Sequence, residues 1–508
     1  MGRTWIMTLK TLVVGLLVCQ ISVGLNAESA MQSPAKTWYE QGEETLKRAL
    51  QKPVNSDVGA AKNIILFVGD GMGVSTLTAA RIYEGQQRGG MGEEHQLSFE
   101  RFPYSGLVKT YNTNQQPPDS AGTMSAMATG IKTKAGFISV DETAKRGDCA
   151  SSKAAHLPTI LDLAERNGKS TGIVSTARVT HATPAALYAH VPERDWENDK
   201  SIPKEQAQHG CTDIAAQLAE YAEGDGIEVV MGGGYKQFLD SGGKRGDGRN
   251  LVTEWQLKHP SSSILRNTKD LQAWDKKSKV LGLFSDSHMD FDWQRDAKEQ
   301  PSLTEMTEAA LAQLKGNKKG FFLMVESGRI DHGHHIGNAY SALTETVEMA
   351  KAVALAGALT DDADTLIIVT ADHSHVMTMA GYPTRGNPIL GKVVSNDSSG
   401  EPEKKAAEAS DGMPYTTLGY MNGKGYSNLG VGGLAMRYVM PERTGRHDLS
   451  DVDTTAAKFH QEALVPTQLE THGGEDVAVY ASGPSAHLLT GNIEQNFIFH
   501  VMKHAAGL

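Results

Sequence analysis

The sequence predicts an α/β domain built around a largely parallel β-sheet. Short runs with the character of buried strands recur along the chain, at residues 63–68, 170–176, 321–325, 365–370 and 476–481. Continuous apolar runs are typical of parallel strands that are covered on both faces. Segments with helical character lie between them, at residues 157–167, 213–223, 303–314 and 339–359. Strands that alternate with helices indicate a sheet with parallel neighbours.

Charged side chains directly follow three of these strands. Asp70 follows the first strand, and Glu326 follows the third. Asp372 and His373 follow the fourth. Ligands of open parallel sheets bind beyond the carboxyl ends of the strands. We therefore expect these four side chains to meet in one crevice.

The densest cluster of such residues is the stretch FFLMVESGRIDHGHH at residues 321–335. Charged and imidazole side chains at the end of a buried strand are costly unless they bind or catalyse something. Asp331 and His335 are four residues apart, so on a helical turn they share one face and can hold one ion. The alternative is a polar surface loop that happens to be rich in histidine.

The candidate metal ligands are carboxylates and imidazoles from distant parts of the chain: Asp70, Glu326, Asp331, His335, Asp372, His373, His375 and His472. This set is too large for one tetrahedral zinc and suits two or three ions. Subsets that contain imidazole favour zinc, and subsets rich in carboxylate suit a harder ion such as magnesium. Paired ions are a recurrent device for phosphoryl transfer.

Residues 117–130 (PPDSAGTMSAMATG) supply a candidate nucleophile. The small residues can form a helix that begins at Ser120, where unpaired N–H groups and the helix dipole favour an anion at the serine oxygen. A zinc ion bound to this oxygen would hold it as an alkoxide. The alternative is that Asp119 or Ser120 merely caps the helix.

Arg178 follows the strand at 170–176 and is the candidate phosphate clamp. A guanidinium binds two phosphoryl oxygens at once, and this arginine should lie at the same crevice as the carboxylates. For an arginine considered by itself, the alternative is a surface ion pair.

The sequence GDGMG at residues 69–73 invites comparison with a dinucleotide-binding turn. Its spacing is GxGxG rather than GxGxxG. Asp70 would also place a negative charge where a pyrophosphate should approach. Both observations argue against a dinucleotide.

Composition indicates a large globular domain. The 508 residues are 21% charged and 39% apolar, which is ordinary for a soluble protein. The net charge of −11 argues against a nucleic-acid-binding surface, for which a basic face is expected. An anionic substrate must therefore be held by local positive charge.

The N-terminus has the pattern of an export signal. A basic segment precedes the apolar run at residues 11–25, and small residues follow at Ala27 and Ala30; this order is that of a signal peptide. We expect residues 1–27 to be removed, giving a periplasmic or secreted protein that is soluble afterwards. The apolar run is short for a membrane span, and a retained N-terminal anchor is the alternative.

The remaining chain divides into three parts. Residues 28–60 predict a polar N-terminal arm with a short amphipathic helix. Residues 61–375 together with 472–508 predict the catalytic α/β domain. Residues 376–471 are rich in Gly, Pro, Ser and Lys and predict an irregular insertion.

Removal of the signal also removes Cys19 and leaves two cysteines, Cys149 and Cys211. An even number in an exported protein indicates one disulfide. Two free thiols are the alternative.

With these residues in view, the chain resembles the alkaline phosphatases, most closely their animal-type branch. The resemblance runs from about residue 60 to the C-terminus and is carried, in order, by VGDGMG, PDSAGTMSAMATG, STARVTHATPAALYAH, VESGRIDHGHH, TADHSHV, AGYPTRG and ETHGGEDVAVYASGP. It implies a three-layer α/β/α sandwich around a central, largely parallel sheet, with residues 376–471 as a crown-like insertion. The implied activity is metal-dependent hydrolysis of a broad range of phosphate monoesters, with release of inorganic phosphate.

The resemblance also implies a role for each candidate residue. Ser120 would form a phosphoserine intermediate, and Arg178 would hold the phosphate. Two Zn²⁺ and one Mg²⁺ are implied for each subunit, with these ligands: Asp331, His335 and His472 for one zinc; Asp70, Asp372 and His373 for the other; Asp70, Glu326 and Thr183 for magnesium. Three further imidazoles would surround the ions and the phosphate without ligating metal: His181, His332 and His375.

The resemblance pairs Cys149 with Cys211 and implies a homodimer. The N-terminal arm and the insertion would make the dimer contacts, with Tyr382 at the subunit boundary.

The chain departs from the family at the fourth, calcium site that animal-type enzymes carry. Ser285 and Gln300 stand where acidic residues are expected, and the segment at residues 232–248 is shortened. These departures argue against Ca²⁺. Three nearby carboxylates offer a substitute set: Asp286, Asp290 and Asp292.

Two other classes remain for comparison. A diesterase or sulfatase on the same fold should replace Ser120 by threonine or a modified cysteine, or lack the magnesium ligands. A non-catalytic metal- or phosphate-binding protein should have lost Ser120, Arg178 or a zinc ligand. All of these residues are present, which favours the phosphomonoesterase.

Overall fold

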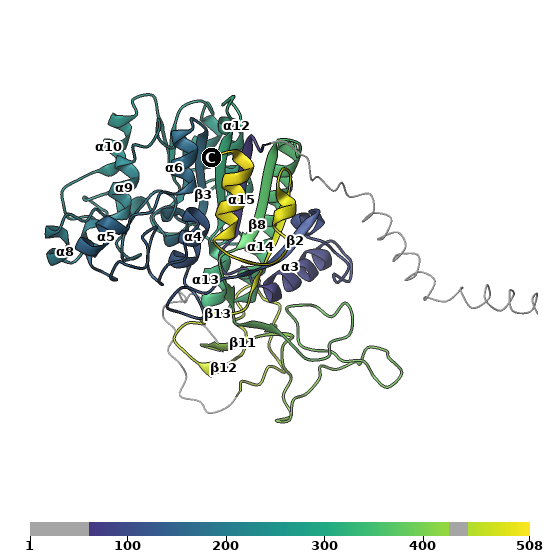
Figure 1. Cartoon of the computed structure of the whole chain (residues 1–508). Coiled ribbons are helices and arrows are strands. Elements are labelled where there is room, and N and C mark those ends of the chain that lie inside the picture. The colour runs from purple at the N-terminus through teal and green to yellow at the C-terminus, as the bar shows by residue number, and fades with distance from the viewer. Residues whose placement is uncertain (1–59, 426–445) are drawn as a thin grey trace, which may run out of the picture. The chain divides into compact units, whose positions relative to one another are not determined.

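The computed structural model describes residues 60–425 and 446–508 (Figure 1). All of them belong to one compact unit, Asn55–Leu508. The expected signal peptide, residues 1–27, lies outside the described residues, and so does the expected arm, residues 28–60, apart from residue 60. Among the described residues, no helix is both long and apolar enough to cross a membrane.

A ten-stranded sheet forms the centre of this unit, in the order β15-β2-β14-β8-β1-β7-β3-β4-β6-β5. Neighbouring strands pair in parallel except at β14, which runs antiparallel to both β8 and β2. The strands are β1 (Asn63–Gly69), β2 (Tyr104–Lys109), β3 (Ser170–Arg178), β4 (Val229–Gly233), β5 (Ser263–Leu265), β6 (Val280–Leu283), β7 (Phe321–Ser327), β8 (Thr365–Ala371), β14 (Val477–Ser482) and β15 (Gly491–Glu494). The prediction of a largely parallel α/β sheet is confirmed.

The innermost strands are the ones with continuous apolar sequences. Every residue of β1, β7 and β8 is buried, because helices cover both faces of the sheet and leave no side of these strands to water. The expected strands at 63–68, 321–325 and 365–370 each extend one or two residues further than predicted. The added residues include Glu326, which therefore lies in the strand rather than after it.

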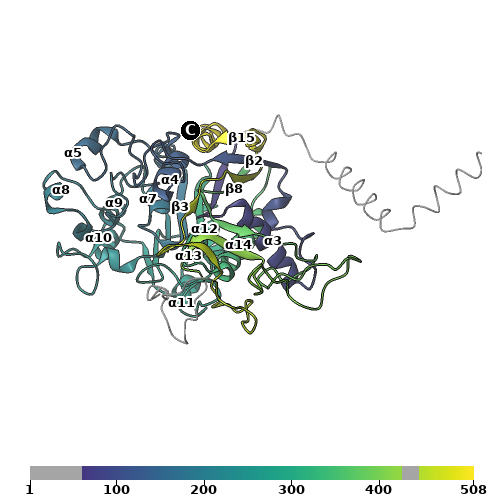
Figure 2. The ribbon, with the colours of Figure 1, turned by 90° about the horizontal axis from the view of Figure 1, so that it is seen from below.

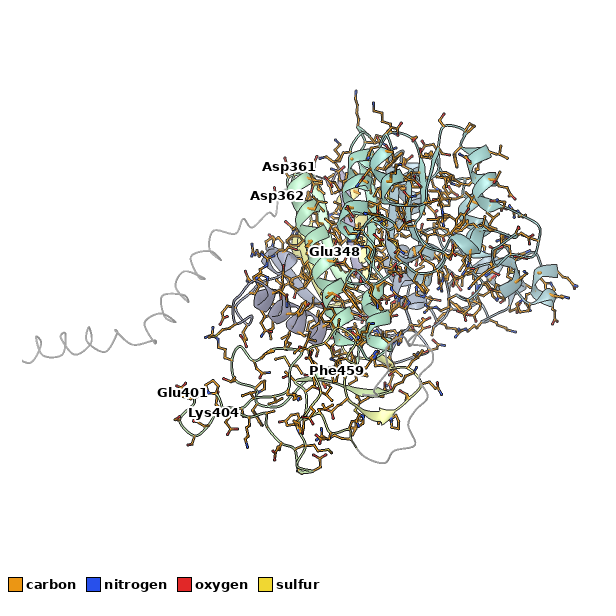
Figure 3. The ribbon with its side chains drawn as sticks, turned by 180° about the vertical axis from the view of Figure 1, so that it is seen from behind. Glu348, Asp361, Asp362, Glu401, Lys404 and Phe459 are labelled. Atoms are coloured by element: carbon orange, nitrogen blue, oxygen red, sulfur yellow. A yellow bond between two sulfur atoms is a disulfide. The ribbon has the colours of Figure 1, made fainter. Side chains whose placement is uncertain are left out.

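Helices lie on both faces of the sheet. In Figure 1 α15, α4 and α6 lie in front of the strands, and Figure 3 shows α14, which carries Glu348, on the opposite side. Figure 2 shows the same separation from below. The helices are α3 (Val74–Gln87), α4 (Ser120–Thr129), α5 (Cys149–Ser152), α6 (Ile160–Arg166), α7 (Ala182–Ala185), α8 (Lys204–Gln208), α9 (Ile214–Glu220), α10 (Leu251–Lys258), α11 (Thr268–Ala273), α12 (Leu303–Leu314), α13 (Arg329–His335), α14 (Ala339–Leu359) and α15 (Phe497–Ala506).

The predicted insertion at residues 376–471 contributes one small sheet, and the two short strands that flank it form another. In one, β10 (Met377–Met379) pairs with β11 (Leu418–Gly423), which pairs with β12 (Ala463–Pro466). In the other, β9 (Ser374–His375) pairs with β13 (His472–Gly473), so that His472 lies directly opposite His375. The two ends of the insertion therefore return to the same place beside the main sheet.

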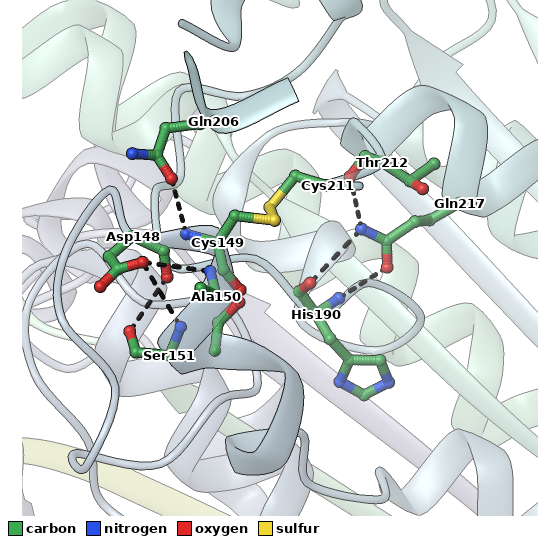
Figure 4. Close-up of a disulfide and its surroundings, with 10 residues drawn as sticks. Asp148, Cys149, Ala150, Ser151, His190, Gln206, Cys211, Thr212 and Gln217 are labelled. Atoms are coloured by element: carbon green, nitrogen blue, oxygen red, sulfur yellow. Dashed lines mark hydrogen bonds between the residues drawn. A yellow bond between two sulfur atoms is a disulfide. The ribbon is translucent and has the colours of Figure 1, made fainter. Parts of the chain in front are cut away.

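A disulfide joins Cys149 to Cys211, with the Cα atoms 5.6 Å apart (Figure 4). The Cys149 backbone N–H donates to Gln206 Oε1 at 2.9 Å. The Asp148 carboxylate caps α5 by accepting from the backbone N–H groups of Ala150 and Ser151. The predicted pairing is present, and it ties the N-terminus of α5 to the connection between α8 and α9.

Candidate metal centre and nucleophile

Three carboxylates of the site come from three adjacent strands. In the sheet, β1 lies between β7 and β8, with Val68 opposite Glu326 and Gly69 opposite Ala371. Asp70 follows β1 and Asp372 follows β8, so both lie beside Glu326 at the carboxyl edge. All three side chains are completely buried. The sequence-based expectation of convergence is met by this register.

One cluster brings together Asp70, Asp372 and His373. The His373 Nε2 atom is 3.4 Å from Asp70 Oδ1 and 3.4 Å from Asp372 Oδ2. Its Nδ1 lies 3.2 Å from the carbonyl oxygen of Ser374, and a carbonyl can only accept, so the proton sits on Nδ1. The Nε2 lone pair therefore faces two carboxylate oxygens. Because no proton lies between the His373 lone pair and the carboxylate oxygens of Asp70 and Asp372, a bound cation would stabilise this arrangement.

A second cluster forms around Asp331. His335 Nε2 is 3.2 Å from Asp331 Oδ1, and His472 Nε2 is 3.4 Å from the same oxygen. The two Nε2 atoms are only 3.2 Å apart.

Both of these imidazoles hold their proton on the far nitrogen. His335 Nδ1 donates to the carbonyl oxygen of Glu470 at 2.6 Å, and His472 Nδ1 donates to that of Pro118 at 2.7 Å. Two lone pairs and a carboxylate oxygen thus converge. Imidazole and carboxylate donors in this arrangement fit zinc.

His375 differs from these two imidazoles because both of its nitrogens face carboxylates. Its Nε2 donates to Asp331 Oδ1 at 2.7 Å, and its Nδ1 donates to Glu470 Oε2 at 2.5 Å. Although burial opposes it, the two carboxylates raise the pKa of His375 to about 10. His375 therefore holds Asp331 through a hydrogen bond from its Nε2, and its place outside the ligand shell stays a prediction.

A third group of oxygens surrounds Glu326. The Glu326 Oε1 atom, the Thr183 hydroxyl and Asp70 Oδ2 are buried and have no hydrogen-bond partner among the described residues. The other Glu326 oxygen accepts from the Ser175 hydroxyl. Buried polar atoms without partners are rare in folded proteins. A hard cation such as magnesium, which prefers oxygen ligands, would satisfy all three.

The carboxylates of the site oppose one another when no cation is present. Burial, and then the neighbouring Asp372, raise the pKa of Asp70 well above its ordinary value. Burial together with Asp372 and Asp331 raises the pKa of Glu326 to about 8, although Ser175 opposes the shift. Buried like charges of this kind are stabilised by bound cations.

Ser120 is the first residue of α4, as predicted, and it does not cap the helix. The capping side chain is Asp119, whose Oδ1 accepts from the Gly122 backbone N–H at 3.1 Å. The Ser120 hydroxyl is buried, 3.1 Å from His373 Nε2 and 3.4 Å from Asp70 Oδ1. The nucleophile candidate therefore joins the metal-ligand cluster.

Arg178 is committed to an ion pair. Its Nε and Nη2 atoms donate to the two oxygens of Glu197, each at 2.7 Å, and its Nη1 contacts His288 Nε2 at 2.5 Å. A bidentate partner already occupies the face that a phosphate would need. The alternative noted for this residue, an ion pair, is the arrangement that the structure contains.

Arg194 is the guanidinium next to the nucleophile, and the sequence reasoning missed it. Its Nη1 lies 3.1 Å from Asp119 Oδ2, beside Ser120, and its Nη2 is 3.3 Å from His181 Nε2. Arg194 lies in a connection between helices rather than after a strand, so the rule used for Arg178 cannot find it. The geometry favours Arg194 over Arg178 as the phosphate ligand.

His181 and His332 lie together with a third imidazole, His288, that was not predicted. The ring centroids of His181 and His332 are 5.6 Å apart, and those of His288 and His332 are 4.1 Å apart. Burial, and then Arg194 and Arg178, lower the pKa of His181 well below its ordinary value. Burial also lowers the pKa values of His332 and His288, so all three imidazoles are neutral, and His181 lies beside Asp70 and Glu326.

The three carboxylates considered as a substitute calcium set each have a separate partner. Lys236 Nζ is 2.9 Å from Asp286 Oδ2, Gln300 Nε2 donates to Asp290 Oδ2 at 3.1 Å, and Arg295 Nε donates to Asp292 Oδ1 at 3.1 Å. Nothing in these contacts brings the three together.

The buried donor sets at the strand ends, together with the sheet, define this chain as a metal-dependent α/β enzyme. Comparison with known proteins makes the assignment specific. The alkaline phosphatase family matches residues 61–508. The tissue-nonspecific alkaline phosphatase of Felis catus is 45% identical over 492 residues, covering 93% of this chain and 88% of its own. The alkaline phosphatase of Gadus morhua is 43% identical over 489 residues, covering 93% and 97%.

Solved structures agree in fold. The alkaline phosphatase of Thermus thermophilus has a TM-score of 0.61 and 23% identity, covering 90% of this chain and 94% of its own. That of the Antarctic bacterium TAB5 has a TM-score of 0.59 and 22% identity, covering 88% and 99%. The chain belongs to the alkaline phosphatase family, as its motifs indicated, and is a phosphoric monoester hydrolase.

Proposed function

We propose that the chain hydrolyses a broad range of phosphate monoesters at alkaline pH through a phosphoserine at Ser120. The observation that carries the proposal is the position of the Ser120 hydroxyl. It lies at the N-terminus of α4, free of any capping role, and within 3.4 Å of two cluster residues, His373 and Asp70. The broad range follows from the roles proposed here, because Ser120, Arg194 and the metal ligands would all act on the phosphoryl group and not on the alcohol of the ester.

The metal complement that we propose is two Zn²⁺ and one Mg²⁺ for each subunit, with Asp331, His335 and His472 for one zinc, Asp70, Asp372 and His373 for the other, and Asp70, Glu326 and Thr183 for magnesium. When bound, the ions supply positive charge that offsets the carboxylates and the phosphoryl oxygens. The converging lone pairs and the unpartnered oxygens support this distribution.

The residues of the chain divide the reaction between them. Ser120 Oγ forms a bond to phosphorus while the bond from phosphorus to the ester oxygen breaks and the alcohol leaves. The backbone N–H groups at the start of α4 and the Arg194 guanidinium stabilise the negative oxygens of the transferring group. Asp119 holds Arg194 at 3.1 Å. Water then displaces Ser120 Oγ from phosphorus, and inorganic phosphate leaves.

Hydrolysis of p-nitrophenyl phosphate at alkaline pH tests the proposal. Activity should disappear with a chelator, return with zinc and magnesium, and fall by at least about 10³-fold in Ser120→Ala. A matched Ser151→Ala variant, which alters a serine far from the cluster in α5, should retain full activity. Chelator-resistant hydrolysis, or a Ser120→Ala variant as active as Ser151→Ala, would overturn the proposal.

We propose that the active form is a homodimer. Apolar side chains of the insertion are exposed on the single chain, among them Tyr382 at 89% and Leu464 at 75%. Contiguous exposed apolar patches mark interaction sites, and we propose that Tyr382 and Leu464 belong to such a patch in the dimer interface. Sedimentation should give twice the chain mass; a monomer at micromolar concentration would contradict the proposal.

We also propose export to the periplasm or the exterior. The N-terminal segment has the pattern of a signal peptide, and the Cys149–Cys211 disulfide is typical of an oxidising compartment. N-terminal sequencing of the mature protein should find a start near residue 28. Retention of residues 1–27 would favour the anchored alternative.

A further inference from the structure

Glu470 lies at the centre of the contacts that hold the Asp331 cluster, although no argument from the sequence selected it. It is only 1% exposed and precedes β13, the strand that carries His472. Its side chain and its backbone both contact imidazoles of the cluster. Removing a carboxylate charge from water is costly, so a carboxylate this deeply buried must be stabilised by hydrogen bonds or by a charged partner.

The Glu470 carboxylate anchors His375 and the chain beside it. Oε2 accepts from His375 Nδ1 at 2.5 Å, and Oε1 accepts from the Val376 backbone N–H at 2.8 Å. The other side of His375 donates to Asp331 Oδ1 at 2.7 Å. Glu470 thus orients Asp331 through one intervening imidazole.

The Glu470 backbone anchors a second imidazole. Its carbonyl oxygen accepts from His335 Nδ1 at 2.6 Å, and its N–H donates to the His335 carbonyl oxygen at 3.0 Å. The first of these bonds fixes the proton of His335 on Nδ1 and leaves the Nε2 lone pair toward Asp331. The carboxylate holds this stretch of backbone in place through Val376, so the side chain and the backbone act together.

We infer that Glu470 is a positioning residue that orients Asp331 and His335 and thereby raises the affinity of their site for zinc. The inference rests on the proposed function, which assigns zinc to Asp331, His335 and His472. Carboxylates that support metal ligands from outside the ligand shell typically contribute 10- to 100-fold in metal affinity (an order-of-magnitude range). A purely structural carboxylate would instead affect folding and leave the zinc affinity unchanged.

Glu470→Gln is the primary test. The amide has one oxygen, while His375 Nδ1–H and the Val376 N–H both need an acceptor, so one of the two contacts must be lost. Zinc affinity is measured on the full-length metal-free protein by competition with a chromophoric chelator. The zinc ion that the wild type binds and Asp331→Ala does not bind is assigned to this site. We expect its dissociation constant to rise by about 10- to 100-fold in Glu470→Gln.

Glu475→Gln is the matched control, because Glu475 is a nearby carboxylate that binds the Ser374 hydroxyl at 2.7 Å and touches no imidazole of the cluster. Its zinc affinity should equal that of the wild type. Glu470→Asp keeps the charge but shortens the reach, so it should weaken zinc binding as well. It serves as the test if Glu470→Gln does not fold.

A second readout separates positioning from structure. The activity that Glu470→Gln loses at limiting zinc should return with excess zinc, because the ligands themselves remain. Zinc affinity within about twofold of Glu475→Gln, or lost activity that zinc does not restore, would overturn the inference. If the wild type binds no zinc that depends on Asp331, the proposed metal site fails first, and the inference fails with it.

Discussion

The site has two parts that the fold supplies in different ways. Asp70, Glu326 and Asp372 come from three adjacent strands, and the parallel register alone brings them together. Arg194 and Glu470 come from the connections, where hydrogen bonds to neighbouring groups set their positions, and His472 comes from the short outlying strand β13. Burial of the strand-borne carboxylates is costly, since it raises their pKa values, whereas hydrogen bonds to neighbouring groups hold the connection-borne side chains. Changes in the first should alter stability together with activity, and changes in the second should alter activity with a smaller change in stability.

The largest effect is expected in the strand-borne part, for Asp70→Asn. Asp70 is shared by two proposed ions, so activity should fall by roughly 10³-fold. The metal-free Asp70→Asn protein should nevertheless be more stable than the metal-free wild type. Burial raises the pKa of Asp70, so the folded chain binds this proton more tightly than the unfolded chain, and stability is lost as pH rises above the ordinary carboxyl range.

Thermal unfolding of the metal-free proteins at pH 8 measures the gain in stability that should accompany the loss of activity. Asp70→Asn should unfold at a higher temperature than the wild type, and the gap should narrow on acidification. Asp290→Asn, which removes a surface carboxylate, serves as the control and should change neither activity nor stability. A metal-free Asp70→Asn protein less stable than the wild type would contradict the claim that the strand-borne carboxylates are costly to bury.

The next effect compares Arg194, which comes from a connection, with Arg178, the last residue of β3. Arg194→Ala should lower kcat/KM by about 10²-fold, since it removes one donor to the transferring phosphoryl group. Its thermal stability should fall less than that of Arg178→Ala, because Arg194 makes one contact to Asp119, and Asp119 still accepts from the Gly122 and Gly136 backbone N–H groups. Arg178→Ala breaks the bidentate pair with Glu197, removes the positive charge beside a buried carboxylate, and should therefore destabilise the fold.

Steady-state kinetics and thermal unfolding of the two variants separate these outcomes. Inorganic phosphate should also inhibit Arg194→Ala more weakly than the wild type. If Arg178→Ala loses phosphate affinity and Arg194→Ala does not, the original choice of Arg178 is the better one.

The last prediction tests whether burial alone makes a carboxylate costly when that carboxylate lies outside the metal-ligand clusters. Glu165, at the end of α6, is 2% exposed, and burial raises its pKa to about 7. The unfolded chain should titrate near its ordinary value, so stability falls as pH rises through this interval. Glu165→Gln should remove that loss, which is on the order of 3 kcal/mol at pH 8.

Denaturant unfolding of metal-free protein at pH 5 and pH 8 provides the measurement. The exposed Glu308 on α12 supplies the control, Glu308→Gln, which should keep the wild-type pH dependence. Equal pH dependence of Glu165→Gln and the wild type would show that burial alone does not make a carboxylate costly in this fold.

The same division explains what the sequence could predict. A buried parallel strand has a local signature, and the residue that follows it has a defined place at the sheet edge. This is why Asp70, Glu326 and Asp372 could be assigned from the strands alone, and why α12 and α14 have the predicted bounds. Short strands such as β4 and β5 have no comparable apolar run and were missed.

The connections carry no such signature. Nothing in the sequence distinguishes the ion-paired Arg178 from Arg194, because the difference lies in a tertiary contact with Glu197. Likewise, only the structure shows that Asp119 takes the capping role and leaves Ser120 free. Glu470 is found only once β9 and β13 are seen to pair.

The most direct test of the account is to trap phosphate on the protein. The metal-loaded enzyme is mixed with p-nitrophenyl phosphate, quenched in acid, digested, and its peptides are mapped by mass spectrometry. We expect a phosphorylated peptide from the start of α4 with the modification on Ser120, and none in Ser120→Ala. Rapid turnover without phosphate on Ser120, or phosphate on another residue, would contradict the account.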